Sequence, residues 1–480
     1  MNKQSHENNL NKDVLKYLPV KILPAFSGLL TIYLLTRTLS MSLYSNYAFL
    51  TAIILLFGQL ISGWINSSVI FFYPEYAVNN SLDALKLNVI ALQLMLYVIG
   101  AIGFAITCYI GLEDFSIILI GLLLLLSQTF LNLLYSFLQA ERRVFVQIQS
   151  TSIQSVIQII GLSICFYYYK ENLYFVMGVL FLSYFVASNY VMYCDKIYGL
   201  ILDKRSFSFL DFSIGKKILF YGLPVCVWFF ASQFYAIGDR VLFKYFNIHN
   251  LVGNYAAFRD LSVGLSGFIT MPLLMASHPI IVQMWKTNVD IAEIEKVLTQ
   301  NIKLLLTFFT PIFIGIFLVG DWVLTQVVGL EYLLDNNLMF LVVFSIFFGT
   351  VSMYLHKGLE VTGRTMLMAK IALTVAFLSL ILNIFFIPMY GVKAAVLISV
   401  ASQIIYCAAV YHFSKEIICI KISYIFIYKN LFLILCAWFI SNYILITDTF
   451  LVIRVCILLI SAIYVLLSSK ELKEMVQTIL

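Results

Sequence analysis

The sequence predicts an all-α protein that crosses a membrane many times. Of its 480 residues, 62% are hydrophobic and 11% are charged, and the mean hydropathy is +0.96. A soluble domain usually carries roughly 25% charged residues. Apolar runs of about 20 residues recur from end to end, and each can cross a ~30 Å hydrocarbon core as a helix. A transmembrane β-barrel would show short alternating segments instead.

Hydropathy places fourteen spans along the chain, and no stretch between them is long enough to form a soluble domain. An even number of spans puts both termini on one side of the membrane. The expected spans are residues 18–38, 47–73, 87–111, 115–139, 147–169, 173–194, 217–240, 255–283, 298–320, 337–361, 367–388, 391–413, 424–445 and 449–468.

Lysine and arginine are distributed unevenly between the two sides. The side with the termini collects most of them. The opposite side and nearby helix ends hold only Arg37, Lys170, Arg240, Lys244, Arg259, Lys393 and Arg454. The positive-inside rule therefore predicts that both termini of this multi-pass protein are cytoplasmic. The net charge of +6 reflects this topology, so we expect no nucleic acid as a partner.

A weak internal repeat predicts two homologous halves. Residues 22–24, 36–39 and 45–48 resemble residues 222–224, 239–242 and 253–256 in the same order. Chance similarity in an apolar sequence is the alternative. Both halves begin on the cytoplasmic side, so the repeat is parallel, and transporters of this kind bind substrate between their halves. The expected domains are an N-terminal lobe (1–195), a cytoplasmic linker (196–216), a C-terminal lobe (217–413) and a region with two helices and a tail (414–480).

Common catalytic and metal-binding motifs are absent from the sequence. The eight cysteines occur singly, without a CxxC pair or a Cys/His cluster, so we expect neither a disulfide framework nor a zinc site. There is no GxxxxGK[ST], no DxD, no HExxH and no nucleophile elbow. The sequence therefore predicts that the protein is not an enzyme and uses no cofactor.

A few ionised residues near the outward ends of spans one, seven and eight are the candidates for a substrate site. They are Arg37, Asp239, Arg240, Arg259 and Asp260. A charge in hydrocarbon costs roughly 2.5–3.5 kcal/mol even on the translocon scale, so it normally faces protein or water. Arg37 and Arg240 lie where they can reach the interface, whereas Arg259 lies about one turn deeper. Arginine suits phosphate because its planar fork donates two hydrogen bonds.

Three expected spans carry polar stripes at helical spacing. These stripes can line a hydrated wall that binds sugar hydroxyls, or they can join helices by hydrogen bonds. The second interpretation is favoured for spans four and five, and the first for span seven. The stripes are Gln128, Asn132, Tyr135 and Gln139; Gln147, Thr151, Gln154 and Gln158; and Tyr221, Pro224, Trp228, Ser232, Tyr235 and Asp239.

Several segments resemble polysaccharide-repeat flippases, the Wzx-type members of the multidrug/oligosaccharidyl-lipid/polysaccharide exporter superfamily. They are residues 359–365 (LEVTGRT), residues 382–383 with 387–395 (IPMYGVKAA), residues 37–39 with 47–48, and residues 239–240 with 253–256. The resemblance covers most of the chain in order and spacing. Residues 40–47 lack the more usual glycine before the tyrosine. The arginine-rich cluster of the lipid II flippase branch is not evident, which argues against that relative.

This resemblance implies two six-helix lobes around a central cavity, plus two C-terminal helices. It also implies a flippase that moves an undecaprenyl-pyrophosphate-linked oligosaccharide from the cytoplasmic to the periplasmic leaflet by alternating access, for O-antigen or capsule synthesis. The bilayer, a polysaccharide polymerase and a chain-length regulator are the further partners considered. The resemblance places this flippase in a bacterial inner (plasma) membrane and makes Arg259 the expected residue for the pyrophosphate. Trp228, Tyr235 and Tyr255 are expected to contact the sugars or line their path. Asp260, Arg37, Asp239 and Arg240 complete the expected substrate-binding residues.

Two other functions stay open. A cation-coupled multidrug exporter shares the fold, although it usually has an unpaired carboxylate deep in a lobe, and none is convincing here. A polysaccharide polymerase or ligase has similar hydropathy, but such enzymes usually carry a large outward loop, which this sequence lacks.

Overall fold

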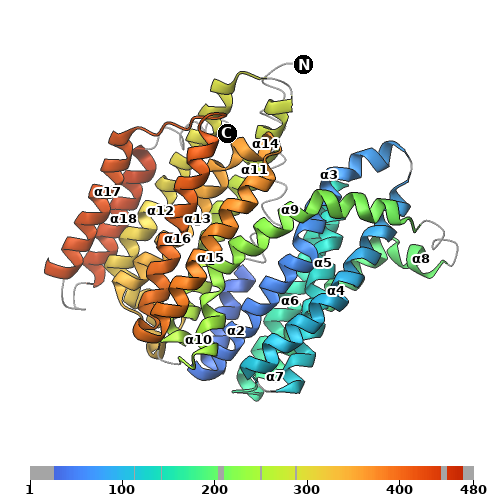
Figure 1. Ribbon diagram of the computed structural model, residues 1–480. Helices are drawn as coiled ribbons and strands as arrows, with labels where there is room; N and C mark the ends of the chain where they lie inside the picture. The colour runs from blue at the N-terminus through green and yellow to red at the C-terminus, as the bar shows by residue number, and fades with distance from the viewer. Residues whose placement is uncertain are drawn as a thin grey trace. The chain divides into compact units, whose positions relative to one another are not determined.

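The structure is a computed structural model that describes residues 26–79, 81–112, 114–141, 143–203, 210–248, 251–286, 289–444 and 451–468. Within these ranges the chain is helical and contains no strand. Residues 26–38 form the first described helix. The elements that follow (Figure 1) are α2 (Met41–Gly58), the π-helical η1 (Gln59–Gly63), α3 (Trp64–Val78), α4 (Leu82–Leu112), α5 (Phe115–Ala140), α6 (Val144–Tyr168), α7 (Leu173–Cys194), α8 (Ile197–Leu202), α9 (Phe212–Ile237), α10 (Asp239–Tyr245), α11 (Val252–Lys286), α12 (Ile291–Val327), the 3-10 turn η3 (Leu330–Tyr332), α13 (Asn336–Leu355), α14 (Lys357–Val361), α15 (Thr365–Tyr390), α16 (Val392–Ser414), α17 (Tyr424–Phe439), η4 (Ile440–Ile444) and α18 (Leu451–Ser468).

The prediction of an all-α, multi-pass membrane protein is confirmed. Each expected span coincides with helical residues over its described part. Among the described residues, eleven helices are long and apolar enough to cross a membrane. Residues 26–38, α11 and α18 are not among these eleven. The count of fourteen spans therefore stays a prediction. Residues 18–25 of the first expected span, which include the first segment of the repeat (22–24), lie outside the described residues.

Side-chain caps fix where several helices begin. Asp114 accepts hydrogen bonds from the backbone N–H groups of Ser116 and Ile117 at the start of α5, at 3.0 and 3.3 Å. Asp211 accepts one from the Ser213 N–H at the start of α9. The first N–H groups of a helix have no partner within it, so an acceptor at this position stabilises the helix end. Gly391, with φ of +57°, separates α15 from α16, and a side chain there would strain the turn.

Packing divides the chain into two compact units. The N-terminal unit contains Ile22–Gly253 and Ala372–Gly391, and the C-terminal unit is described from Asn254–Ile371 and from Val392 onward. Helices α9 and α10 and the later part of α15 thus pack with the first helices of the chain. The expected lobes are defined from the internal repeat in the sequence, whereas these units are defined by contacts between helices. The division into the expected lobes therefore stays a prediction.

The core of the N-terminal unit is built from α3, α4, α5, α7 and α9. Trp64, Leu134, Phe137 and Val191 belong to one cluster of buried side chains there. Helix α9 passes close to α3 at Gly222, where a Cβ atom would overlap the ring of Trp64. Small residues of this kind allow two membrane helices to approach and pack by van der Waals contact.

The C-terminal unit is organised around α12, which packs against α13, α17 and α18 (Figure 1). Phe309 and Phe313 of α12 pack against Phe347 of α13, with ring centroids 5.2 and 6.0 Å apart. A buried hydrogen bond of 3.0 Å from the Thr310 hydroxyl to the Asn430 amide oxygen joins α12 to α17. Helix α17 is thereby tied to α12, and Arg454 of α18 donates to the Leu318 carbonyl of α12 at 3.4 Å.

Candidate functional site

Arg259 lies inside α11 of the C-terminal unit and is 4% exposed. Its Nη1 donates a hydrogen bond to the hydroxyl of Tyr255, one helical turn earlier. The guanidinium also lies 5.7 Å from the centre of the Tyr255 ring, within the range of a cation–π contact. Tyr255 itself is fully buried. The phenol therefore holds the buried cation in one orientation.

The start of α11 is anchored by Asn254. Its side-chain nitrogen donates to the backbone carbonyls of Glu331, within the η3 turn, and Leu333, directly after it, each at 2.9 Å. Asn254 is buried at 4% exposure. Since Tyr255 follows directly and Arg259 lies one turn further along the same helix, this anchor sets the position of both. Ser262 and Ser266, which share the helical face of Arg259, are buried as well.

Asp239 and Arg240 lie at the start of α10 in the N-terminal unit, and both are buried. The Asp239 carboxylate accepts a hydrogen bond of 2.9 Å from the Arg240 backbone N–H. Helix α10 packs against α2, α4 and α9. Lys244 of α10 donates to the Asn46 amide oxygen of α2 at 2.9 Å, and burial lowers the pKa of Lys244 below its ordinary value. These contacts place a group of charges against α2.

Arg37 ends the helix of residues 26–38 in the same unit. Its guanidinium carbon lies 3.8 Å from the centre of the Tyr33 ring, which is itself 39% exposed. Arg37 is half-buried. A cation over an aromatic ring at partial exposure is stabilised by about 0.5–1 kcal/mol. The guanidinium is thus held on an aromatic side chain of its own helix.

The aromatic candidates lie on two different helices. Trp228 and Tyr235 belong to α9, where Trp228 is half-buried and Tyr235 is 6% exposed. Tyr255 belongs to α11, and Asp260 next to Arg259 is half-buried. Of the eight predicted residues, the structure places Arg37, Trp228, Tyr235, Asp239 and Arg240 in the N-terminal unit, and Tyr255, Arg259 and Asp260 in the C-terminal unit.

The polar stripes of α5 and α6 join helices, as the favoured interpretation predicts. The hydroxyls of Tyr135 in α5 and Ser150 in α6 are 3.1 Å apart. The Gln158 amide nitrogen in α6 donates to the Thr31 hydroxyl at 2.9 Å. Both bonds lie within the N-terminal unit. The prediction is confirmed for these two stripe residues, Tyr135 and Gln158.

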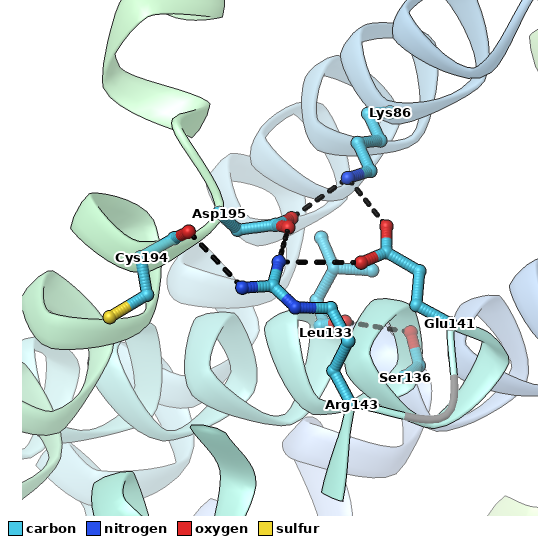
Figure 2. Close-up of polar contacts among 7 residues, drawn as sticks. All are labelled: Lys86, Leu133, Ser136, Glu141, Arg143, Cys194 and Asp195. Atoms are coloured by element: carbon cyan, nitrogen blue, oxygen red, sulfur yellow. Dashed lines mark hydrogen bonds and ion pairs between the residues drawn. The ribbon is translucent and has the colours of Figure 1, made fainter. Parts of the chain in front are cut away.

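A buried ionic network, which sequence reasoning did not identify, joins four helix ends of the N-terminal unit (Figure 2). Lys86 of α4 lies 2.7 Å from the Glu141 carboxylate and 2.8 Å from that of Asp195. Arg143 lies 2.6 Å from Asp195 and also donates to the Cys194 carbonyl. Only 10% of the Lys86 side chain and 4% of the Asp195 side chain are exposed.

A signal for this network exists in the sequence. Asp195 directly follows one expected span and Glu141 lies two residues after another, on the side where Lys86 and Arg143 lie. The positive-inside rule counts such cations as markers of topology and does not ask which acids lie beside them. The rule therefore does not detect that two acids and two cations lie together at adjacent helix ends.

Within the described residues, no group of three or more His, Cys, Asp or Glu side chains could hold a metal ion. All eight cysteines are free thiols.

The sequence profile of a family described as "Polysaccharide biosynthesis protein" matches residues 10–285. The chain is also 25% identical over 389 residues to the capsular polysaccharide biosynthesis protein CapF of Staphylococcus aureus, covering 78% of this chain and 90% of that protein.

Solved structures share the fold. The lipid II flippase MurJ in its inward closed conformation superposes with a TM-score of 0.68 at 15% identity, covering 93% of this chain and 96% of that one. The MATE multidrug transporter DinF-BH superposes with a TM-score of 0.60 at 14% identity, covering 88% and 98%. These proteins are a flippase and a transporter, and the likeness shows that this chain has the same fold. The family profile over residues 10–285, the similarity to CapF and this fold together confirm the resemblance to polysaccharide-repeat flippases.

Proposed function

The chain belongs to the polysaccharide biosynthesis protein family, and we propose that it is a flippase for a lipid-linked oligosaccharide. The cargo would be an oligosaccharide repeat unit on undecaprenyl pyrophosphate. It would move from the cytoplasmic to the outer leaflet by alternating access, for the synthesis of a surface polysaccharide. The family membership, the similarity to CapF and the fold shared with MurJ support this proposal.

The observation that carries the proposal is the buried Arg259 in α11. A pyrophosphate cannot enter hydrocarbon unaided, because an isolated charge there costs several kcal/mol or more. A guanidinium held by Tyr255 provides a charge-assisted donor whose orientation is already fixed. The lipid tail can stay in the bilayer while this cation meets the phosphate.

The other predicted residues receive separate roles. Arg37, Asp239, Arg240 and Asp260 would set the electrostatic environment of the path, and Trp228 and Tyr235 would contact sugar rings. Tyr255 is fully buried against Arg259, so we assign it a positioning role instead of direct contact with sugar. The cation distribution supports a bacterial inner-membrane location with both termini cytoplasmic. A polymerase and a chain-length regulator would act on the product.

The test replaces Arg259 in cells that depend on this chain for surface polysaccharide. Arg259→Ala should abolish the polysaccharide and cause lipid-linked units to accumulate in the cytoplasmic leaflet, with the protein still present in the membrane. Arg259→Lys keeps the positive charge but loses the planar guanidinium with its paired N–H donors, so we expect partial activity. Arg364→Ala, at an exposed arginine outside the helices, is the matched control and should be silent. Full polysaccharide from Arg259→Ala would remove this site assignment.

Tyr255→Phe tests the positioning role separately. It removes only the hydroxyl that accepts from Arg259, so transport should fall about tenfold while the folded protein persists. A variant that transports normally would show that this hydrogen bond does not orient the cation.

A multidrug exporter is the second candidate, because DinF-BH has the same fold. An exporter would extrude cationic dyes in a manner that depends on a proton or sodium gradient. Cells that lack the chain should then become sensitive to dyes while their polysaccharide is unchanged, which is the reverse of the flippase phenotype.

A further inference from the structure

A cavity of about 650 Å³ opens at the end of α12 in the C-terminal unit. Its walls come from the last turns of α12, the η3 turn, the start of α13 and the start of α18. The positive-inside rule predicts that this end of α12 faces outward, since Lys296 and Lys303 lie near the opposite end. All of its lining residues belong to one unit, and none is among the eight candidate residues for the pyrophosphate path.

Five polar side chains and one indole ring line the cavity together. Asp321, Trp322 and Thr325 come from α12, Asp335 lies directly before α13, Asn336 begins α13, and Arg454 comes from α18. The Asn336 amide nitrogen donates to the Asp321 carboxylate at 3.0 Å. The Arg454 guanidinium donates to the Leu318 carbonyl at 3.4 Å. The polar groups are thus held in place by the protein before any ligand arrives.

The indole of Trp322 is 47% exposed. An exposed tryptophan near an interface often serves only to anchor a helix in the headgroup region. Trp322 differs because its ring lines a cavity that also holds two carboxylates, an amide and a hydroxyl, with Asp335 as the second acid. A membrane anchor has no need of these groups, whereas a ligand with one apolar face and several hydroxyls would use all of them.

The charges select the class of ligand. Asp321 and Asp335 give two negative charges against the one positive charge of Arg454, so the cavity does not favour a phosphate. Carboxylates accept hydrogen bonds from hydroxyls, while amide and guanidinium groups donate to them. The C–H face of a pyranose ring packs well on an indole. The volume lies in the range of small-molecule sites, about 300–1,000 Å³, and accommodates a short saccharide.

We propose that this cavity, lined by Asp321, Trp322, Thr325, Asn336 and Arg454, is a saccharide-binding site at the outward end of the C-terminal unit. The inference rests on the proposed function only in one respect, namely that the bound sugar would come from a lipid-linked oligosaccharide. In that setting the site would hold the sugar end of the headgroup after it has crossed, apart from the residues that meet the pyrophosphate. A free saccharide of the same chemistry would bind by the same contacts.

The test uses the full-length protein in lipid nanodiscs, free of glycoside detergents, and measures tryptophan fluorescence and its quenching by acrylamide. The probes are the intact lipid-linked oligosaccharide and the same oligosaccharide released from its lipid by mild acid. We expect the released oligosaccharide to shift the fluorescence and to protect Trp322 from acrylamide. Binding of the lipid-linked form alone would instead show that the site requires the attached lipid, and would contradict recognition through sugar contacts.

Variants assign the signal to the cavity. Trp322→Phe should remove the fluorescence change. Trp438→Phe is the matched control, because Trp438 is also partly exposed, at 36%, and its indole donates to Asn337 rather than into the cavity. This variant should keep the fluorescence change on oligosaccharide binding. Asn336→Ala should weaken binding about tenfold, as expected for the loss of one well-placed hydrogen bond.

Three results would overturn the site. One is the absence of any response to both oligosaccharide probes. Another is an equal loss of signal in Trp322→Phe and Trp438→Phe. The third is strong quenching of Trp322 by lipids with brominated acyl chains that the oligosaccharide does not relieve, which would show a cavity filled by lipid. Arg259→Ala separates the two proposals, because it should stop transport and leave binding of the released oligosaccharide unchanged.

Discussion

The ionic network of the N-terminal unit allows a quantitative test of how much a buried charge stabilises this protein. We consider Lys86→Met, which keeps the length of the side chain and removes its charge. At 2.8 Å and an effective dielectric constant of about 20, the gross attraction of Lys86 to Asp195 is about 6 kcal/mol. The desolvation of both groups offsets much of this attraction.

Removing one partner of a buried pair usually destabilises a protein by about 3–5 kcal/mol, because the other charge is left buried. Arg143 still reaches Asp195 at 2.6 Å and Glu141 at 3.6 Å, so we expect the lower end, about 3 kcal/mol. The exposed pair Lys217–Glu75, also 2.7 Å long, is the matched control. Its side chains are 47% and 51% exposed, so Lys217→Met should destabilise the protein far less than Lys86→Met.

The assay is reversible unfolding by SDS in mixed micelles, followed by circular dichroism. The double variant Lys86→Met/Glu141→Gln should lose less stability than the two single variants added together, since it removes an acid that has lost its partner. Equal losses for Lys86→Met and Lys217→Met, or strict additivity in the double variant, would refute the claim that burial decides the contribution of these charges.

Two other predictions concern packing and pH. Gly222→Ala places a methyl group against the Trp64 ring and should destabilise the protein by about 1–3 kcal/mol. Gly215→Ala in the same helix meets open space and should be neutral or stabilising by up to about 1 kcal/mol. Thermal unfolding in detergent measures both changes in stability. The hydrogen bond from Tyr174, followed by the backbone N–H groups of α5, lowers the pKa of Asp114 from its ordinary value of 3.8. Its contribution to stability should therefore be complete above pH 3.8 and disappear as the pH falls through the lowered pKa. Asp114→Asn should remove this acid dependence, and an unchanged acid limb of the stability profile would argue against it.

Much of the fold is predictable from hydropathy, because the length of a membrane helix is set by the bilayer. The range 173–194 agrees residue for residue with α7, and 115–139 with α5 to within one residue. The extension of α11 and α12 beyond their expected spans was not predicted. Polar residues can continue a helix into water, because hydropathy marks the end of the apolar stretch and not the end of the helix.

The candidate site is less predictable than the fold. The position of Arg259 within a span pointed to a buried cation. The role of Tyr255 as its acceptor depends on side-chain direction, although the spacing of four residues is compatible with it. The Lys86 network and the cavity at the end of α12 unite residues more than 100 positions apart. Their assembly depends on how helices pack, which no local pattern specifies.

Transport of a defined lipid-linked oligosaccharide by the purified protein in sealed vesicles, with ion gradients varied, tests the proposed function most directly. We predict that the wild-type chain moves the oligosaccharide headgroup between leaflets, that Arg259→Ala does not, and that Arg364→Ala does. Movement of a cationic dye in the same vesicles, with the lipid-linked oligosaccharide left in its original leaflet, would contradict the flippase assignment.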